Sequence, residues 1–596
     1  MVLPDADATF EPGSPHVSRS DGGTWLGHPR QLARLFSVEA WERFGFYGLR
    51  ALLVLYLTNH FLLSDREANG LYGGYMSLVY LTPVVGGLIA DRYLGSKRSV
   101  KFGAIVMAVG YFLLCFGGQP AKPFAVIDGQ RYEVTEQKAS GDTKLQFITA
   151  AGQHLRIKGQ PDGSVQLLAD DGHVARTVAK RDFSSDAHRS PFYVTLMLFA
   201  LSLIVVGNGF FKPNISTIVG SLYAEGDRRR DAGFTIFYWG INIGSIGSQT
   251  FCPVLVTMFG WWAGFLLAAI GMLFAYALIR FDGGRLAGYG EPPVQEGKDR
   301  AAIIYILAIL AAPITWLVLR NVMEAPEAAA GAGFVGYLLA LPVLGKVLFV
   351  TFLAAVVGIP VWAWRAGTRA EFQMMLAAVI LVVFNVTFWT LFEQAGSSLT
   401  LFADRNTDLN LFGLTMSAAQ TQNFNPITIV LFAPVMSWLW LALAKRNWEP
   451  SIPIKFGLAL VLVGAGFVLL AFSGHFAGSG FRVSLWWLVA TYFLHSIAEL
   501  CISPVGLSMI TKLSIARVVG MMMGVWFLSI SVAEYFAGAI AQAASVQTVG
   551  GQVTNAELSL HTYLGSFQTG GIATIAAGVL LLVLAPVLKR LMHGVR

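Results

Sequence analysis

Charged residues are scarce in this chain, and long apolar runs are abundant. Only 13% of the 596 residues are Asp, Glu, Lys or Arg, whereas 55% are hydrophobic, and the mean hydropathy is +0.59. Many of the apolar runs exceed the roughly 20 residues that an α-helix needs to cross a bilayer. This composition excludes a soluble enzyme with a short anchor and predicts an all-α, polytopic membrane protein.

The motifs of several other protein classes are absent as well. The three cysteines fall in apolar runs, where cysteine packs as a small hydrophobic residue and forms neither a disulfide framework nor a metal site. We find no His cluster with metal-ligand spacing, no GxSxG nucleophile turn and no P-loop. We therefore expect neither a membrane-embedded enzyme nor an ATP-driven pump, and no metal or other cofactor. The first thirty residues are polar, so no cleaved signal peptide is expected.

The net charge of +7 reflects basic loops rather than a nucleic-acid partner. One set of loops collects most of the Lys and Arg residues, and the opposite short loops hold only scattered ones such as Arg66, Arg405 and Arg482. Basic loops stay in the cytosol, so both termini are predicted to be cytosolic. The basic set consists of Arg92, Lys97, Arg98, Arg228, Arg229, Arg230, Lys445, Arg446, Lys512, Arg517, Lys589 and Arg590.

Fourteen membrane-spanning helices are predicted, in groups of six, two and six. The expected spans are residues 31–59, 69–90, 100–117, 191–223, 231–256, 258–280, 301–320, 333–364, 371–402, 413–444, 454–474, 484–511, 517–542 and 562–588. We divide the chain into a cytosolic tail (1–30), an N-terminal six-helix bundle (31–280), a linker with two extra helices (281–370) and a C-terminal six-helix bundle (371–596). Two six-helix halves around a central cavity are typical of secondary transporters.

Residues 118–190 differ from the rest of the N-terminal half. Alternating polar and apolar runs are separated there by dipeptides that favour tight turns, namely Asp128-Gly129, Asp162-Gly163 and Asp171-Gly172. We predict a small β-hairpin module on the extracytoplasmic side, and we favour a structural cap over a receptor domain. Residues 545–560 predict a second, shorter hairpin around a Gly-Gly pair.

The first predicted helix carries four charges in an otherwise apolar stretch. At about 100° per residue, Glu39, Glu42, Arg43 and Arg50 fall on one face. Each charge at the centre of a bilayer costs roughly 2.5–3.5 kcal/mol on insertion scales, so this face must look into protein or a water-filled cavity. One interpretation is that Glu39 and Arg43 simply pair one turn apart. The interpretation that we favour is a path for protons and substrate.

The end of the second predicted helix carries a distinctive loop sequence. Gly86-Gly87 is followed by Asp91-Arg92, Gly95 and Lys97-Arg98. This spacing resembles the cytosolic loop signature of the major facilitator superfamily, in which glycines let neighbouring helices approach and an aspartate bonds to the end of a nearby helix. The resemblance implies a fold of 12 core transmembrane helices in two six-helix bundles, here with a two-helix linker insertion, and a gating role for Asp91.

Stretches in six predicted helices resemble the proton-coupled oligopeptide transporters of that superfamily. Glu39-x-x-Glu42-Arg43-Phe44-x-Phe46-Tyr47-Gly48 is similar to the signature of their helix 1, although the family usually has a tyrosine where Phe46 stands. GFFKPNIST and FTIFYWGINIGS are similar to helices 4 and 5. FWTLFEQAGSS, NFNPITIVLFAPVMSWLW and AELCISPVGLSMITKLS are similar to helices 7, 8 and 10. The resemblance implies import of di- and tripeptides with protons, in a bacterial inner membrane.

The residue types in these stretches suit a short peptide. Such a peptide is a zwitterion, so its site needs a cation for the carboxylate, an anion for the amino group and adaptable walls. The resemblance implies that Arg43 and Lys212 bind the carboxylate. It further implies that Asn242, Asn425 and Glu499 hold the amino end.

Further substrate-binding residues are expected around these charges. Tyr47, Tyr80, Trp389 and Trp526 would line pockets for the peptide side chains, although the alternative for such aromatic residues is simple packing. Ser503 lies one turn after the predicted binding glutamate and completes the expected substrate site.

Proton coupling needs carboxylates whose proton affinity depends on the conformation of the cavity. Glu39, Glu42 and Glu393 are the candidates, because burial and a nearby arginine such as Arg43 shift the pKa of a carboxylate in opposite directions. Arg50 lies about 10 Å beyond the Glu-Glu-Arg cluster on the same helix face. We predict that Arg50 pairs with Glu393 to close the external gate, and that protonation of Glu393 opens it.

A carrier of another small substrate, such as a peptide-like drug or nitrate, is the alternative function. Nitrate needs cations but no anion opposite them, whereas Glu499 supplies an anion. Sugars need many polar side chains rather than an Arg and a Lys facing a Glu. The expected partners are protons, di- and tripeptides and the lipid bilayer, with no nucleic acid, and the protein is expected to act as a monomer.

Overall fold

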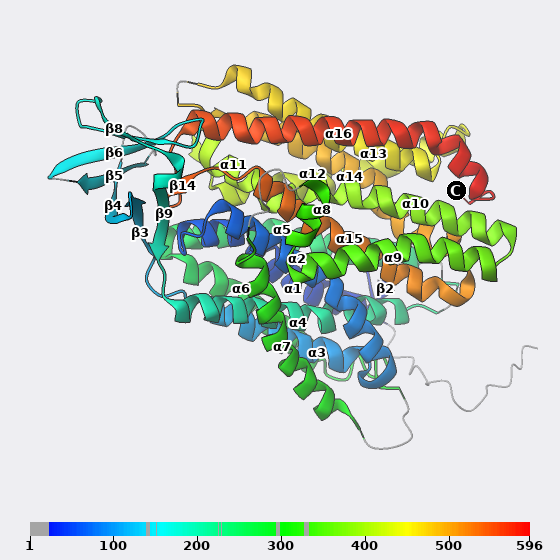
Figure 1. Ribbon diagram of the computed structural model, residues 1–596. Coiled ribbons are helices and arrows are strands. Elements are labelled where there is room, and N and C mark those ends of the chain that lie inside the picture. Colours follow the sequence, from blue (N-terminus) through cyan, green and yellow to red (C-terminus); the bar gives the residue numbers. More distant parts are fainter. Residues whose placement is uncertain are drawn as a thin grey trace, which may run out of the picture.

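The computed structural model describes residues 23–138, 144–150, 152–224, 226–227, 229–293, 299–326, 333–478 and 480–595. Residues 1–22 of the predicted tail, Arg228 of the basic loops and parts of the linker lie outside the described residues. In the described chain, long helices run alongside one another, and a β-sheet stands beyond one end of them (Figure 1). We call the end of the helices next to this sheet the β end.

The described chain contains two groups of membrane-length helices with a linker between them. The N-terminal half contains α1 (Gln31–Asn59), α2 (Asp65–Ile89), α3 (Ser96–Leu114), α4 (Pro191–Ser221), α5 (Arg230–Phe259) and α6 (Trp261–Arg280). The linker contains α7 (Ala301–Met323), α8 (Gly333–Ala340) and α9 (Val343–Ala366). The C-terminal half contains α10 (Arg369–Phe392), α12 (Phe424–Lys445), α13 (Ile452–Phe472), α14 (Leu485–Leu513), α15 (Val519–Ala543) and α16 (Ala556–Leu591).

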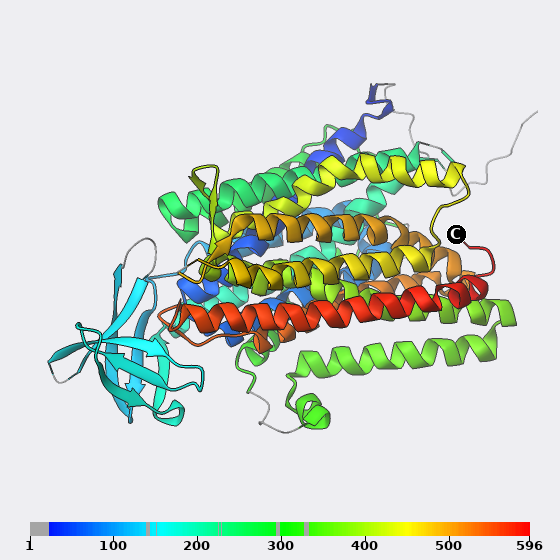
Figure 2. The same ribbon diagram turned by 90° about the horizontal axis from the view of Figure 1, so that it is seen from above.

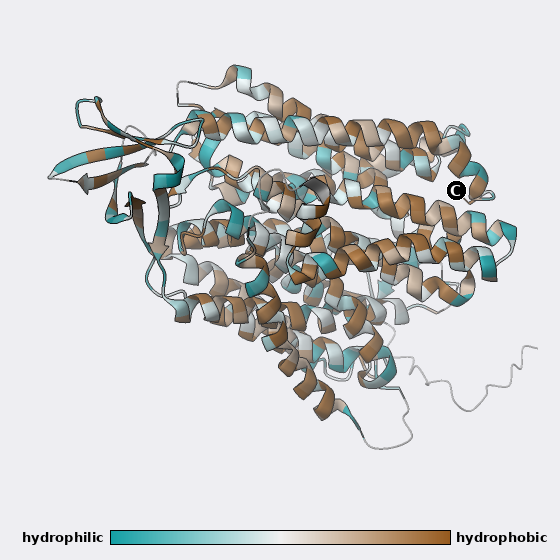
Figure 3. Cartoon of the chain, in the orientation of Figure 1, coloured by the Kyte–Doolittle hydropathy of each residue, from teal (hydrophilic) through white to brown (hydrophobic). Residues whose placement is uncertain are grey.

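Among the residues that the structure describes, eleven helices are long and apolar enough to cross a membrane. The helices α1, α3 and α5 have more polar sequences and are not among these eleven, so the count of fourteen spans stays a prediction. Colouring by hydropathy shows apolar residues along the helices and polar residues on the sheet and near helix ends (Figure 3). The predicted polytopic helical fold with a small β insert is therefore confirmed.

The predicted helix at 333–364 is wrong as a single element. The short helix α8 ends at Ala340 and α9 begins at Val343, with Pro342 between them. A proline disfavours helical backbone in the residue that precedes it, so the chain turns at this point. The described part of the linker consequently contains two membrane-length helices and a short third one.

Two helices of the C-terminal half also differ from their predicted bounds. The span predicted at 371–402 is interrupted by η3, a 3₁₀ turn over Glu393–Gly396, before the helix resumes as α11 (Ser398–Asn406). The span predicted at 413–444 begins only at Phe424. The residues before it form a short hairpin and the 3₁₀ turn η4 over Ala418–Asn423.

The helix α2 begins four residues earlier than its predicted start at residue 69. The side chain of Ser64 accepts a hydrogen bond from the Glu67 amide, and the Glu67 carboxylate accepts one from the Ser64 amide at 2.8 Å. This reciprocal capping box satisfies two amide groups that would otherwise lack partners at the helix start. The polar residues of the first turn therefore belong to the helix and not to the loop.

The insert forms one antiparallel seven-stranded sheet in the order β8-β7-β6-β5-β4-β3-β9. Three of its turns lie at the predicted Asp-Gly dipeptides, and the first has Asp128 and Gly129 at φ values of 51° and 78°, as a tight hairpin turn requires. The prediction of a β-hairpin module is thus confirmed. The strands are β3 (Lys122–Ile127), β4 (Gln130–Lys138), β5 (Lys144–Ala150), β6 (Gln153–Gly159), β7 (Val165–Leu168), β8 (Val174–Val178) and β9 (Phe183–His188).

The predicted hairpin within residues 545–560 is also present, and it connects the sheet to the C-terminal half. It consists of β14 (Thr548–Val549) and β15 (Gln552–Val553), and Val549 belongs to the hydrophobic core of the sheet. Ser185 of β9 donates a hydrogen bond to the Thr548 carbonyl oxygen at 2.9 Å. Figure 2 shows the sheet projecting beyond the β end of the helices.

Shorter two-stranded ladders complete the described strands. They pair β1 (Thr24–Trp25) with β2 (His28–Pro29), β10 (Thr407–Asp408) with β13 (Val483–Ser484), and β11 (Asn410–Leu411) with β12 (Leu414–Thr415).

The two halves contact each other along α2 and α15. A side chain on Gly73 would come within 2.7 Å of the Gly538 Cα atom, so both positions need glycine for the two helices to approach this closely. One turn along, the Ser77 and Ser531 hydroxyls form a hydrogen bond of 2.9 Å. This seam is a close backbone contact between helices from opposite halves.

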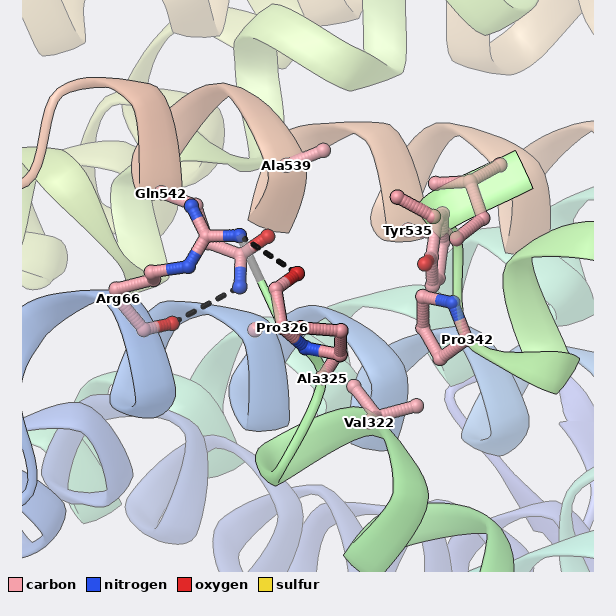
Figure 4. A pocket seen from close by; sticks show the side chains of 11 residues that line it. Arg66, Val322, Ala325, Pro326, Pro342, Tyr535, Ala539 and Gln542 are labelled. Carbon is pink, nitrogen blue, oxygen red and sulfur yellow. Dashed lines mark hydrogen bonds between the residues drawn. The ribbon is translucent and has the colours of Figure 1, made fainter. Parts of the chain in front are cut away.

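The linker packs against the same seam from outside. Figure 4 shows a pocket between α2, α15 and the linker, in which Arg66 donates to the Pro326 carbonyl oxygen at 3.3 Å. Gln542 donates to the Arg66 carbonyl oxygen at 3.0 Å. The described linker helices therefore pack against α2 and α15 and do not line the cavity between the halves.

A buried ion pair joins the halves at the β end, and its loss is our first prediction. Arg405 of α11 donates to Asp65 of α2 through two nitrogens, one of them at 2.6 Å, and also to the Tyr563 hydroxyl. Arg405→Ala would leave a buried carboxylate without its cation, so we expect a loss of about 3–5 kcal/mol in the free energy of unfolding. Thermal unfolding of the purified protein in detergent measures this loss.

The exposed pair between Arg320 and Glu324 provides the control for this prediction. It joins residues one turn apart on α7 at 2.9 Å, with both side chains about half exposed. Arg320→Ala should change the stability by less than about 1 kcal/mol. Equal losses from the two substitutions would contradict a stabilising role for the buried pair.

Candidate functional site

A cavity of about 180 Å³ lies between the two halves. The N-terminal half supplies its walls through α1, α2, α4 and α5, and the C-terminal half supplies them through α10, η3, η4, α12 and α14. Eight of the residues that line it were predicted as substrate-binding or gate residues. The predicted residues in the lining are Arg43, Tyr47, Arg50, Tyr80, Lys212, Asn242, Asn425 and Glu499.

Four charged side chains form a network behind one wall of the cavity. Arg43 donates to both carboxylate oxygens of Glu42, each at 2.5 Å, and lies 3.6 Å from Glu39. Lys212 of α4 donates to Glu39 at 2.5 Å. Glu39 and Glu42 are completely buried. Their charges are balanced by Arg43 and Lys212, which also line the cavity.

The local sequence explains how this network is built. Glu39 and Arg43 are one turn apart on α1, and Phe46 places its ring 4.5 Å from the Arg43 guanidinium, where a cation–π contact holds the charged group. Beside Lys212, the helix α4 continues through Pro213 to Ser221, although a proline removes one hydrogen bond from a helix. The neighbouring helices support the helix at such a proline in a membrane.

The opposite wall carries the acidic group. Asn425 of α12 donates to Glu499 of α14 at 3.1 Å and to the Ser496 hydroxyl at 3.0 Å. Asn242, from the N-terminal half, donates to the Tyr238 carbonyl oxygen one turn earlier at 3.1 Å.

The predicted pair between Arg50 and Glu393 is present. The Arg50 guanidinium donates to the Glu393 carboxylate at 2.6 Å and to the Tyr72 hydroxyl at 3.4 Å. Its charged group lies 5.7 Å from the centre of the Tyr47 ring. Because α10 ends at Phe392, the 3₁₀ turn that follows presents Glu393 to α1 from the other half. The pair joins α1 to the C-terminal half beside the cavity, and its role as a gate stays a prediction.

Seven of the predicted site residues are absent from the lining of the cavity. Glu39, Glu42 and Glu393 lie behind it, where they pair with its cations. The other four lie elsewhere. The indole of Trp389 donates to Asn385 on its own helix at 3.1 Å, and the rings of Trp526 and the hydroxyl of Ser503 lie outside the lining. Asp91 is exposed in the π-helical turn Ala90–Leu94, away from the cavity. Sequence patterns identify the helix that bears a residue but not the side that it presents to its neighbours.

Several lining residues were not predicted. Further hydroxyl and amide groups in the walls come from Tyr238, Gln249, Gln422 and Tyr492. A polar residue within an apolar stretch was the signal that could have identified them. Glu534 of α15 was also missed, although a single carboxylate in a long apolar run is the same signal that identified the charges of α1. It is completely buried beside the Arg50–Glu393 pair.

A space with cations on one wall and an anion on the other suits a molecule that carries both charges. Among the described residues there is no group of three His, Cys, Asp or Glu side chains that could hold a metal ion. The arrangement is therefore suited to binding a zwitterion, and its charged groups come from both halves of the protein.

Comparison with known proteins identifies the family. Residues 97–556 match the sequence model of the POT family. The chain is 31% identical over 579 residues to the uncharacterized transporter YclF of Bacillus subtilis, with 96% of each chain covered. It is 30% identical over 567 residues to dipeptide and tripeptide permease A of Cronobacter turicensis, with 94% of this chain and 93% of the relative covered.

Solved structures agree with this assignment. The fold is similar to that of a mutant of peptide transporter POT in complex with alafosfalin, with a TM-score of 0.70, 28% identity, and 96% and 97% of the two chains covered. It is also similar to tetrameric PepTSo2, with a TM-score of 0.68 and 26% identity over 94% of this chain and 99% of that one. The chain belongs to the POT family of peptide transporters, which has the major facilitator fold and consists of carriers rather than enzymes.

Proposed function

We propose that this protein imports di- and tripeptides together with protons by alternating access of the central cavity. The observation that carries the proposal is the separation of charge across one cavity, with Arg43 and Lys212 on the N-terminal wall and Glu499 on the C-terminal wall. A peptide that bridges the two halves matches this separation, because its ends carry opposite charges. The family assignment supports the same substrate class.

In this proposal the carboxylate of the peptide binds Arg43 and Lys212. The amino group binds Glu499, with the amides of Asn242 and Asn425 beside it. The hydrogen bond from Asn425 to Glu499 supports this arrangement, because it orients the carboxylate at the cavity wall. Burial makes each charged contact stronger than the same contact in water.

The walls between the charges accommodate the peptide side chains. Tyr47 and Tyr80 line the cavity and provide aromatic surface for groups of varied shape. Trp389, Ser503 and Trp526 lie outside the present lining, so they would contact a peptide only after their helices move.

Proton coupling follows from competition for the same cations. Glu42 and Glu39 accept hydrogen bonds from Arg43 and Lys212 at 2.5 Å. A proton on either carboxylate removes its negative charge and frees a cation for the peptide carboxylate. Substrate binding and proton binding then favour each other, which is the thermodynamic requirement for symport.

Each end of the cavity is assigned to one side of the membrane, and each end has its own gate. The Arg50–Glu393 pair closes the β end, and protonation of Glu393 would release Arg50 and open it. We assign the β end to the extracytoplasmic side, because the basic loops lie at the opposite end of the helices. Both termini are then cytoplasmic in a bacterial inner membrane, Asp91 belongs to the cytoplasmic gate, and a single chain contains the whole transport path.

A carrier for a peptide-like drug is the second candidate, and the related structure in complex with alafosfalin favours it as an additional substrate class. Nitrate is disfavoured because Glu499 would repel it from the C-terminal wall. Competition against dialanine uptake distinguishes these substrates, since a drug that shares the site lowers uptake and nitrate leaves it unchanged.

Uptake of labelled dialanine into vesicles containing the purified protein is our second prediction and tests the proposal directly. An acid exterior and a negative interior should drive accumulation above the external concentration, and collapse of both gradients should abolish it. Excess unlabelled tripeptide should compete, because it presents the same charged ends. Uptake that ignores the proton gradient would contradict symport, and no uptake at all would contradict peptide transport.

A further inference from the structure

A carboxylate without an assigned role lies beside the Arg50–Glu393 pair. Glu534 of α15 is 0% exposed, and neither of its carboxylate oxygens has a hydrogen-bond partner among the described residues. Glu393 and Arg50 interact with it electrostatically. Nearly all buried polar groups have partners, so an unpartnered carboxylate in the middle of a membrane helix requires an explanation.

The neighbours of Glu534 come from several helices. Arg50 of α1 is the cation, Glu393 of η3 is the second acid, and Tyr72 and Tyr80 of α2 also interact with Glu534 electrostatically. The helices α10 and α9 present uncharged groups to the residues on either side of Glu534, namely Thr390 to Ala533 and Gly345 to Tyr535. Arg50 is thus the cation that both carboxylates share.

Charge counting shows why a proton is needed here. If Glu393 and Glu534 were both ionised, one guanidinium would face two carboxylates, and a negative charge would remain unbalanced inside the membrane. Two interacting carboxylates around one cation hold a proton jointly. Arg50 donates to Glu393 at 2.6 Å, so Glu393 is the ionised partner. Glu534 receives no hydrogen bond from the described residues and is the position that suits a neutral acid.

We propose that Glu534 is a proton-binding site, and that Arg50, Glu393 and Glu534 form a gate triad that closes with one proton bound. The proposal rests on the symport function proposed above and adds a carboxylate on α15 to the coupling residues. Protonation forms one O–H bond on Glu534 with a proton from water and needs no other reactant.

The packing of α15 connects this proton to the opening of the gate. The seam between α2 and α15 places the backbones of Gly73 and Gly538 in contact one turn from Glu534. Opening the β end must separate these two helices, because they belong to opposite halves. Separation admits water to Glu534, so its proton exchanges with the outside when the gate is open and is held when the seam closes.

Infrared difference spectroscopy tests the proton on Glu534 without any transport. A protonated carboxyl group absorbs apart from a carboxylate, so wild-type protein in lipid vesicles should show a buried protonated carboxyl band near neutral pH. Glu534→Gln should lose this band, and Glu133→Gln, which removes an exposed carboxylate from β4, should retain it. An intact band in the Glu534→Gln variant would overturn the proposal.

Two further measurements complete the test. Glu534→Asp retains an acid at shorter reach, so its band should persist at a shifted frequency, and an unshifted band would refute the assignment even if the glutamine variant does not fold. In uptake assays, Glu534→Gln should move the pH dependence of dialanine accumulation by about one unit toward acid, and an unmoved profile counts against the triad. Failure of wild-type uptake would instead contradict the proposed function, while the infrared band would still report on Glu534.

Discussion

Replacing Glu393 by glutamine should leave peptide exchange intact and abolish proton-driven accumulation. The ratio of internal to external dialanine should fall from roughly 500 to about 1. One proton moving down 100 mV releases about 2.3 kcal/mol, and one pH unit adds about 1.4 kcal/mol, which together set the larger ratio. The variant cannot release and rebind a proton at the Arg50 pair, so neither gradient is coupled to gate opening. Counterflow of labelled dialanine against unlabelled dialanine measures exchange, and uptake under an imposed gradient measures accumulation.

The control for this prediction is an exposed carboxylate of the same half. Glu557 lies in the first turn of α16 with an exposed side chain, and Glu557→Gln should retain both exchange and accumulation. Full accumulation by the Glu393→Gln variant would show that the Arg50 pair does not couple protons to transport.

The second large effect concerns the amino end of the substrate. Glu499→Gln removes the anion from the C-terminal wall while its hydrogen-bonding partner Asn425 remains. Loss of a buried charged contact of this kind costs about 3–4 kcal/mol, so we expect the affinity for dialanine to fall by roughly 100- to 1,000-fold. Titration calorimetry of the purified protein at fixed pH measures this change.

A modified substrate separates the loss of this contact from general damage to the site. N-acetyl-dialanine lacks the charged amino group, so wild type should bind it weakly and Glu499→Gln should bind it with nearly the same affinity as wild type. The two changes then fail to add, as expected for groups in direct contact. Additive losses would indicate that Glu499 acts through the structure of the wall and not on the amino group.

The helical part of the fold follows closely from the sequence. The helix α1 has the bounds predicted for it, 31–59, because polar residues on both sides and a continuous apolar run between them set its length. Interruptions were harder to predict. The break at Pro342 had a local cause that could be recognised, whereas the 3₁₀ turn at Glu393 depends on the contact with Arg50 from the other half.

The candidate site was predictable in its residues but not in its geometry. Charges in apolar runs identified Arg43, Lys212 and Glu499, since a membrane helix carries a charge only for a reason. The orientation of Trp389 and Trp526 depends on how each helix is rotated against its neighbours, which a single sequence does not encode locally. The partners of Glu534 come from α1, α2 and η3, so no pattern within α15 could indicate them.

The β-sheet has a mechanical consequence for the proposed transport cycle, in which the two halves move relative to each other. The chain enters and leaves it from α3 and α4, yet its core contains Val549 from the hairpin that joins α15 to α16. The side-chain amide of Asn555, at the start of α16, also donates a hydrogen bond to the Gly159 carbonyl oxygen of β6 at 2.9 Å. The sheet is thus attached to both halves of the protein. Each transport cycle must either detach it from the C-terminal half or bend the β14–β15 hairpin that holds it.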